Sequence, residues 1–383
     1  MSENFVKQRR MMMLMDKLAV DLLWLRPGKV GGTEFFTRNL LDGFTELDEQ
    51  FKLTLICSED SADSFRKYES DPRFEILTTP VANANISKRI IWQNLHLNSF
   101  LKKNGLKRCF SPVYDRPVLR GGIDWYTVVH DIQAIHYPKY HPLHEVLYSK
   151  MVWNADRRNS ILNITTTDYV KEDIVKYYRF DPEKIQVINI PVTVDKPMVS
   201  DETYDAFCKK YSIEGEYFYS ISQMIPHKNF PTLVKLMAEI RKNHPELPQK
   251  LYISGISGNG TAEFEALLKE EDLEDTIIRT GFIPNEDKIL FYSNCKYFLF
   301  PSYFEGFGIP PVEAMMCGAT VVTTNKTSIP EVTQGKANYV DDPLSVDEWI
   351  NVIKDAVNRD NEMDFERYDK KVIAQQFYDV LFS

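Results

Sequence analysis

Short apolar segments rich in β-branched and aromatic residues alternate with segments of helical period along the whole chain, and this alternation restricts the fold more than any other feature. It is typical of parallel sheets whose strands are joined by crossover helices, so we expect an α/β protein. The expected strands are residues 17–25, 51–57, 74–77, 107–110, 125–130, 161–165 and 184–188 in the first half, and 216–221, 250–254, 276–280, 297–300, 320–323 and 337–340 in the second.

Amphipathic segments between the strands predict helices, and a proline-containing segment predicts a linker. Residues 191–197 hold two prolines and show no helical period, which is typical of an interdomain linker. Each half has enough strands for an open sheet, so we expect two Rossmann-like domains facing each other across a ligand-binding cleft. The 383 residues suit that number of domains. The expected helices include residues 34–47, 87–103, 143–158, 168–178, 232–242 and 345–358.

Composition and charge exclude some classes of protein and indicate the cellular compartment. The formal net charge of −9 disfavours non-specific binding to nucleic acid. No run of 18 apolar residues occurs, so we expect no membrane span and a cytoplasmic protein. The cysteines are odd in number, widely spaced and never in a C-x-x-C pair, which predicts reduced core residues. They are Cys57, Cys109, Cys208, Cys295 and Cys317.

The segment 301–314 combines a glycine-containing loop with two carboxylates. It follows an apolar strand and leads into a helix that starts at Ile309. A helix N-terminus favours an anionic ligand, and Gly306 and Gly308 allow that ligand to approach the backbone. Glu305 and Glu313 bracket the loop, and carboxylates accept hydrogen bonds from vicinal hydroxyls. The pattern therefore predicts a phosphate with sugars on both sides, although a strand-to-helix turn with a capping Glu explains Glu313 alone.

Residues 301–318 resemble, almost letter for letter, the signature P-S-x-x-E-G-F-G-x-P-x-x-E-A-M-x-x-G of the retaining family 4 glycosyltransferases. The resemblance implies the GT-B fold, with a final helical segment, 364–381, that crosses back onto the first domain. On this basis we expect a first domain of residues 1–193, completed by about 361–383, that binds the acceptor. The second, 194–360, binds the nucleotide sugar. By the same resemblance, Glu305 holds the donor sugar and Glu313 the ribose.

Two segments of the first half resemble further parts of that family. Gly31 and Gly32 match its N-terminal glycine loop, although a Gly-Gly turn is weak evidence by itself. His130, at the end of an expected strand, matches a histidine that lines the donor-sugar pocket. A neutral or cationic imidazole can donate a hydrogen bond to a sugar hydroxyl or a phosphate oxygen. The alternative is that His130 and Asp131 only cap a loop.

The loop 221–229 matches the family segment whose Arg and Lys neutralise the donor diphosphate. Lys228 matches the Lys, but Gln223 and His227 stand at the two places where the family has its Arg. Neither supplies the cationic fork of Arg. The predicted catalytic residues are His130, Lys228 and Glu305. The predicted donor-binding residues are Gly31, Gly32, Gln223, His227, Lys228, Ile283, Glu305, Gly306, Phe307, Gly308, Ile309 and Glu313.

The resemblance implies a retaining hexosyltransferase that uses a nucleotide diphosphate sugar and a glycan or lipid-linked acceptor in cell-surface polysaccharide synthesis. GDP-mannose is the favoured donor and UDP-glucose-type donors come next. No Asp-x-Asp motif occurs, so we expect no metal or other cofactor. The alternatives are a non-catalytic GT-B subunit and a nucleotide-sugar epimerase. Trp92, His96 and the loop 137–144 are acceptor candidates by position, and Lys7, Arg9 and Arg10 form a small basic cluster for membrane contact.

Overall fold

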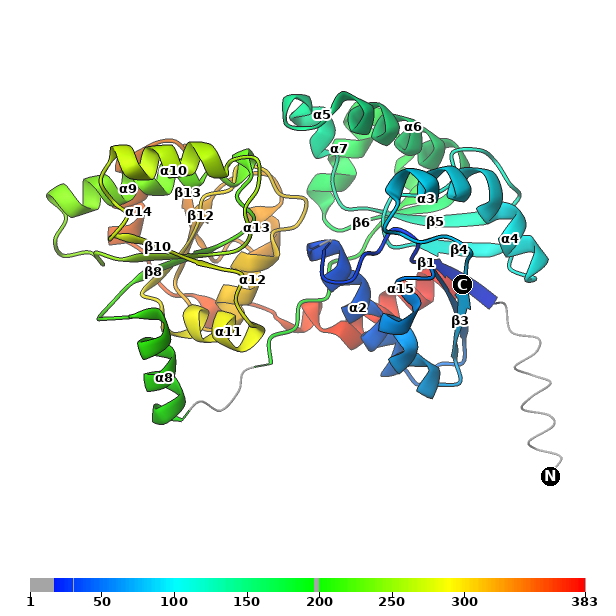
Figure 1. The fold of residues 1–383 in the computed structure, drawn as a ribbon, viewed down its shortest axis with the longest axis horizontal. Coiled ribbons are helices and arrows are strands. Elements are labelled where there is room, and N and C mark those ends of the chain that lie inside the picture. The colour runs from blue at the N-terminus through cyan, green and yellow to red at the C-terminus, as the bar shows by residue number, and fades with distance from the viewer. Residues whose placement is uncertain (1–16, 30, 196–199, 383) are drawn as a thin grey trace. The chain divides into compact units, whose positions relative to one another are not determined.

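The computed structural model describes residues 17–29, 31–195 and 200–382, which form two compact units. The first unit runs to Pro191 and is completed by residues from Glu366 onward. The second comprises the described residues between Val192 and Phe365. Each unit holds one parallel sheet with helices on both faces (Figure 1). The expected α/β class with two Rossmann-like domains is confirmed.

The first sheet has seven parallel strands in the order β3-β2-β1-β4-β5-β6-β7. The strand order reverses direction between β1 and β4, and such switch points are where open α/β sheets place ligands. β1 ends earlier than expected, because Asp21 accepts a hydrogen bond from the Leu23 amide and turns the chain. The strands are β1 Lys17–Asp21, β2 Lys52–Cys57, β3 Phe74–Thr78, β4 Arg108–Ser111, β5 Asp124–Val129, β6 Ser160–Thr165 and β7 Ile185–Val187.

Helices cover both faces of the first sheet. α2 and α15 lie on one face, and α3, α4, α6 and α7 lie on the other (Figure 1). α15, near the C-terminal end of the chain, packs on α2, where Phe377 contacts Phe36. The two helices are so close at Gly43 that a side chain at this position would collide with the Lys370 carbonyl. The helices are α2 Gly32–Thr45, α3 Ile86–Trp92, α4 Asn98–Lys103, α5 Gln133–His136, α6 Leu143–Asn159, α7 Asp168–Tyr178 and α15 Lys370–Phe382.

The expectation of one regular helix over residues 87–103 was wrong. α3 and α4 are separated by a π-helical turn, Gln93–Leu97. The turn directs the Gln93 side chain into the protein, where its Nε2 donates to Asp21 Oδ2 at 3.1 Å and to the Asp115 carbonyl at 2.9 Å. An extra residue in a helical turn redirects a side chain in this way, and such turns frequently occur at functional sites.

The second sheet has six parallel strands in the order β10-β9-β8-β11-β12-β13. α9, α10 and α14 cover one face, and α11 and α12 cover the other (Figure 1). The strands are β8 Phe218–Ile221, β9 Leu251–Ser254, β10 Ile277–Gly281, β11 Tyr297–Phe300, β12 Val321–Thr324 and β13 Asn338–Val340. The helices are α8 Asp201–Tyr211, α9 Phe230–Asn243, α10 Thr261–Glu270, α11 Asn285–Asn294, α12 Ile309–Met316, α13 Ile329–Val332 and α14 Val346–Lys354.

The core of the second unit explains why its helices form where they do. α9 has a buried face made by Leu233, Met237 and Ile240, which recur at the spacing of one helical face. These residues pack with strand residues such as Ile253 and Leu299. Packing of this kind fixes the strand ends, and the loops after β8, β10 and β11 therefore emerge at the same edge of the sheet.

The cysteines are all unpaired thiols, as expected, but only some of them lie in the core. Cys57, Cys109 and Cys317 are buried, whereas Cys208 and Cys295 are half-buried, so the expectation of five core residues was wrong for these two. Within the described residues, no helix combines the length and the apolar character that a membrane crossing requires.

Candidate donor-binding site

The loop between β11 and α12 is built around a left-handed glycine at the start of the helix. Gly308 has φ 95° and ψ 63°, a region that favours glycine, and Pro310 and Pro311 follow in the first turn. This geometry starts α12 abruptly at Ile309, and because Pro310 and Pro311 carry no N–H, the amides of Gly308 and Ile309 are the donors at the start of the helix, at the carboxyl edge of the sheet. Phe307, just before, is buried and anchors the loop.

Two residues after β12 hold this loop in shape. The Glu305 amide donates to Thr327 Oγ1 at 3.0 Å. Ser328 Oγ lies 2.9 Å from the carbonyl oxygens of both Glu305 and Phe307, so its hydroxyl hydrogen is shared between them. The backbone on either side of Gly306 is thereby fixed before any ligand arrives, which is the preorganisation that an anion site requires.

Lys228 and Glu305 form an ion pair across two neighbouring loops. Lys228 Nζ lies 2.6 Å from Glu305 Oε1, and the side chains are 15% and 11% exposed. The backbone joins the same loops, because the His227 carbonyl accepts hydrogen bonds from the Tyr303 amide and from Ser302 Oγ. His227 itself is buried. Sequence spacing alone did not show that Lys228 and Glu305 meet, and the pairing of β8 with β11 explains why they do.

Glu313 is buried in α12 and is held by two residues of α11. Lys288 Nζ lies 2.7 Å from Glu313 Oε1, and the Tyr292 hydroxyl donates to Oε2 at 3.0 Å. Burial and the neighbouring Glu313 charge raise the pKa of Tyr292 well above its usual value, so its hydroxyl stays protonated as a donor. Lys288 and Tyr292 were missed in the sequence. Their spacing of four places them on one helical face, but it does not show which residue that face contacts.

The remaining residues predicted for the second half lie in loops after β8 and β10. Gln223 is exposed just beyond β8, and Ile283 is buried just beyond β10. Between them, Gly255 follows β9 with φ 124°, and a Cβ there would collide with the Ser222 carbonyl. This close approach of two backbones brings the loop after β9 beside the loop that carries Gln223.

In the first unit, the structure brings His130 close to the helix that follows the glycine loop. Gly31 has φ 63° and precedes α2, whose first residue is Gly32. Phe36 of α2 packs edge-on against the His130 ring, with centroids 5.0 Å apart. α2 therefore connects the glycine loop, at its start, with His130, which contacts the helix at Phe36.

His130 is held in one neutral form. Its Nε2 lies 2.8 Å from the Pro112 carbonyl oxygen, so Nε2 carries the proton and donates it, which leaves Nδ1 as an acceptor. Burial lowers the pKa of His130 to about 4, and the hydrogen bond to Pro112 opposes this only in part. Asp131 caps the next turn through the Gln133 amide. Asp131 therefore caps a loop, as the alternative interpretation expected. His130 does not share that role and instead contacts the Pro112 carbonyl and the Phe36 ring.

Residues 208–372 match the family model described as glycosyl transferases group 1. This match covers both ion pairs, the loop 301–308 and α12. Most of the second unit is thus similar to the group 1 glycosyltransferases.

Curated relatives of this chain include O-antigen enzymes. O-antigen chain mannosyltransferase B of Escherichia coli is 31% identical over 226 residues, which are 58% of this chain and 58% of that protein. O-antigen chain mannosyltransferase RfbU of Salmonella typhimurium is 28% identical over 331 residues, 82% of this chain and 86% of that one. The matched part spans only 58% of the first of these relatives and about 30% of the mannosyltransferase WbdA of Escherichia coli.

Solved structures share the fold of this chain. HepE from Anabaena, solved in complex with UDP and glucose, has a TM-score of 0.72 and 17% identity over 96% of this chain and 100% of that one. The sucrose-phosphate synthase of Thermosynechococcus elongatus has a TM-score of 0.71 and 16% identity over 95% and 98%. The predicted GT-B fold is confirmed.

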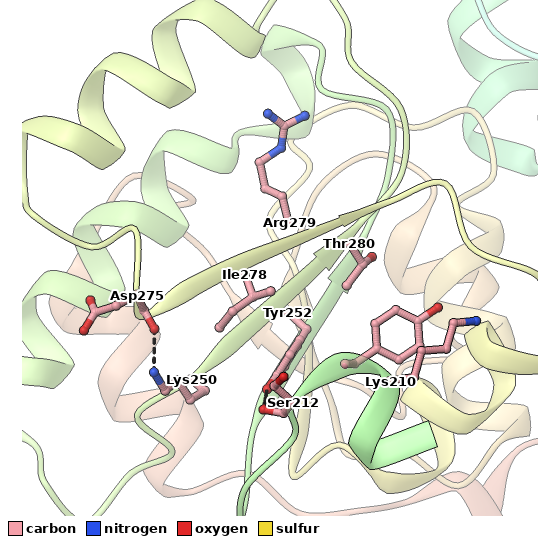
Figure 2. A pocket seen from close by; sticks show the side chains of 9 residues that line it. Lys210, Ser212, Lys250, Tyr252, Asp275, Ile278, Arg279 and Thr280 are labelled. Carbon is pink, nitrogen blue, oxygen red and sulfur yellow. Dashed lines mark hydrogen bonds between the residues drawn. The ribbon is translucent and has the colours of Figure 1, made fainter. Parts of the chain in front are cut away.

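A separate cavity of about 480 Å³ lies in the second unit, between α8 and strands β9 and β10 (Figure 2). Its basic residues have partners: Lys210 pairs with Asp287 at 2.6 Å, and Lys250 Nζ donates to the Asp275 carbonyl at 2.5 Å. None of the predicted donor-binding residues lines it. We therefore place the candidate donor site at the edge formed by Lys228, Glu305 and Glu313 rather than in this cavity.

Proposed function

We propose that the protein is a retaining hexosyltransferase. It moves a hexosyl group from a nucleotide diphosphate sugar to a glycan or lipid-linked acceptor during synthesis of a cell-surface polysaccharide. The match to the group 1 glycosyltransferases supports the reaction class. The O-antigen mannosyltransferases among the relatives support the pathway class.

One observation carries the proposal: both signature glutamates are already paired with lysines around a helix N-terminus. Glu305 pairs with Lys228 before α12, and Glu313 pairs with Lys288 within it. A diphosphate at the start of α12 places phosphate charge near Lys228, which can then exchange its carboxylate partner for the ligand. Glu305 is thereby released to accept hydrogen bonds from the donor sugar, and Glu313 faces the ribose.

The chemical step needs stabilisation of the departing diphosphate. The bond between the anomeric carbon and the diphosphate oxygen breaks, and its electron pair leaves with the nucleotide. A bond forms between the anomeric carbon and the acceptor oxygen on the same face, and the acceptor proton passes to a donor phosphate oxygen. Lys228 and the amides of Gly308 and Ile309 stabilise the negative charge that develops, with little reorganisation because the loop is already fixed.

His130 acts as a neutral group in this proposal. Its Nε2 proton is committed to Pro112, so Nδ1 accepts a hydrogen bond from a donor-sugar hydroxyl. The positions that lack the family Arg are Gln223, which is exposed, and His227, which is buried. Lys228 therefore provides the main side-chain cation for the diphosphate, and the reaction is proposed to need no metal.

GDP-mannose is the proposed donor, because several relatives are mannosyltransferases. UDP-glucose-type donors are the runner-up, since HepE, which shares the fold, was solved with UDP and glucose. A second candidate function is a non-catalytic subunit that binds a nucleotide, which the absence of the family Arg near Lys228 favours.

Incubation of the purified protein with GDP-mannose or UDP-glucose tests the proposal, with nucleotide release and the anomeric configuration of the product as readouts. We expect slow donor hydrolysis without an acceptor, transfer with a mannose-containing acceptor, and retained α configuration by NMR. Nucleotide binding without any hydrolysis or transfer would favour the non-catalytic subunit. An inverted product would contradict the retaining mechanism.

A further inference from the structure

Three neighbouring segments of the first unit expose apolar side chains that the core does not use. We define the α3–α6 face as the outer surface of residues 86–103, 117–122 and 143–158. It holds seven of the thirteen large hydrophobic side chains that are exposed in the described part of the chain. They are Ile86, Ile91, Leu95, Leu119, Leu143, Leu147 and Met151.

The exposed apolar residues of α6 are regularly spaced and form a stripe along one side of the helix. Leu143, Leu147 and Met151 recur every four residues and are 74%, 52% and 55% exposed. The opposite side of α6 supplies the core through Val152 and Trp153, which are buried. The helix therefore has one apolar face for the sheet and a second apolar stripe for another surface.

Hydrogen bonds hold the three segments together as one surface. Tyr148 of α6 donates to Asp115 Oδ1 at 2.9 Å, and Arg89 of α3 forms an ion pair with the same carboxylate. The Val118 amide donates to Asn94 Oδ1 at 2.9 Å, which fastens the loop 117–122 to the π-helical turn. α3, α4 and α6 also lie on the same side of the first sheet (Figure 1).

The charge of this surface is opposite to that of the whole chain. The three segments of the face contain eight Lys and Arg and two acidic residues, Glu145 and Asp156, of which Arg89 and Asp156 are buried, whereas the whole chain carries a net charge of −9. Lys88, Lys150 and Arg158 are exposed, and none of them forms an ion pair within the described residues. Glu145 is the exposed carboxylate of α6.

We propose that the α3–α6 face docks on an anionic lipid bilayer. The apolar side chains enter the interfacial region while the lysines and arginines contact anionic headgroups, a combination that binds proteins to bilayer surfaces. A second copy of the chain fits less well, because a two-fold contact would bring this basic surface against itself. The proposal goes beyond the transfer reaction and does not depend on it. The basic cluster at Lys7, Arg9 and Arg10 lies outside the described residues.

Vesicle flotation of the full chain tests the docking face. We expect binding to phosphatidylcholine vesicles that contain about one third phosphatidylglycerol, weaker binding as salt rises, and little binding to phosphatidylcholine alone. The triple change Leu143→Ser, Leu147→Ser and Met151→Ser removes the stripe. It is expected to lower the partition coefficient about tenfold or more while the melting temperature is kept, because the side chains are exposed.

Matched controls distinguish vesicle binding through this face from non-specific binding by exposed apolar residues elsewhere. The triple variant Ile256→Ser, Leu344→Ser and Val357→Ser removes equally exposed apolar residues of the second unit and is expected to bind vesicles like the wild type. A second test compares vesicle binding by a variant in which three basic residues of the face are neutralised with binding by a variant in which three lysines of the second unit are neutralised. It uses Lys88→Gln, Lys150→Gln and Arg158→Gln against Lys209→Gln, Lys235→Gln and Lys269→Gln.

Several outcomes overturn the proposal, and each is independent of glycosyl transfer. They are no binding to anionic vesicles, equal losses in the face and control variants, or unchanged binding in both face variants. A dimer in sedimentation experiments without lipid, dissociated by the α6 triple variant, would assign the face to a second copy instead.

Discussion

The buried ion pair of the first unit and the two ion pairs of the candidate donor site differ in their access to solvent. Arg116 and Asp156 are 1% and 0% exposed and lie 3.1 Å apart between α6 and the first sheet. Lys228 and Glu305 are 15% and 11% exposed. A ligand cannot reach an ion pair that is enclosed in the protein, whereas a partly exposed pair can exchange one partner for a ligand. We therefore expect the Arg116–Asp156 pair to stabilise the fold and the Lys228–Glu305 pair to bind substrate.

The largest effect is expected for the enclosed pair. Arg116→Ala leaves the Asp156 carboxyl buried without its cation, so we expect a loss of about 3–5 kcal/mol in the free energy of unfolding. Urea denaturation measures it. Lys228→Ala is the matched comparison and should cost less than about 1 kcal/mol. Equal losses in the two variants would contradict the distinction.

Lys228→Ala should instead affect the reaction. We expect kcat/KM for the donor to fall at least roughly tenfold, about 1.4 kcal/mol, because the diphosphate loses its main side-chain cation. Lys235→Ala changes an exposed lysine of α9 and is the control. Unchanged kinetics in Lys228→Ala would remove this residue from the site.

A smaller effect is expected for Lys288, which we regard as a positioning residue for Glu313. Lys288→Ala should raise the donor KM roughly fivefold, about 1 kcal/mol, with kcat nearly unchanged, because Tyr292 still holds the carboxylate. Lys296→Ala removes an exposed ion pair with Glu216 and serves as the control. A fall in kcat with an unchanged KM would contradict a role in donor binding.

Much of the fold was predictable from the sequence because strands and helices leave local periodic patterns. Every expected strand occurs, and the loop 301–308 lies where a strand-to-helix turn was expected. The π-helical turn at Gln93 was not predictable, because it depends on the hydrogen bond to Asp21, which lies far away in the sequence. Lys288 was missed for the same reason, since its partner is set by how α11 packs on α12. Partners that depend on packing leave no local signal.

The smallest effect concerns pH and stability. His130 has a pKa of about 4 when folded, below the ordinary histidine value near 6.5. Between these values the unfolded chain binds a proton that the folded chain does not, so stability falls as pH drops from about 6.5 to about 4. His130→Gln should make urea midpoints at pH 5 and pH 7 more alike than in the wild type. An unaltered difference between the two midpoints would show that His130 does not titrate in this way.

Calorimetric titration of GDP and GDP-mannose into the wild type and into Glu305→Gln tests the central claim most directly. The account predicts that the wild type binds the nucleotide sugar more tightly than GDP, because Glu305 contacts the sugar. In Glu305→Gln this difference should shrink while GDP binding persists through Lys228 and α12. Loss of GDP and GDP-mannose binding in equal measure, or an unchanged preference for the nucleotide sugar, would contradict the assignment of Glu305 to the donor sugar.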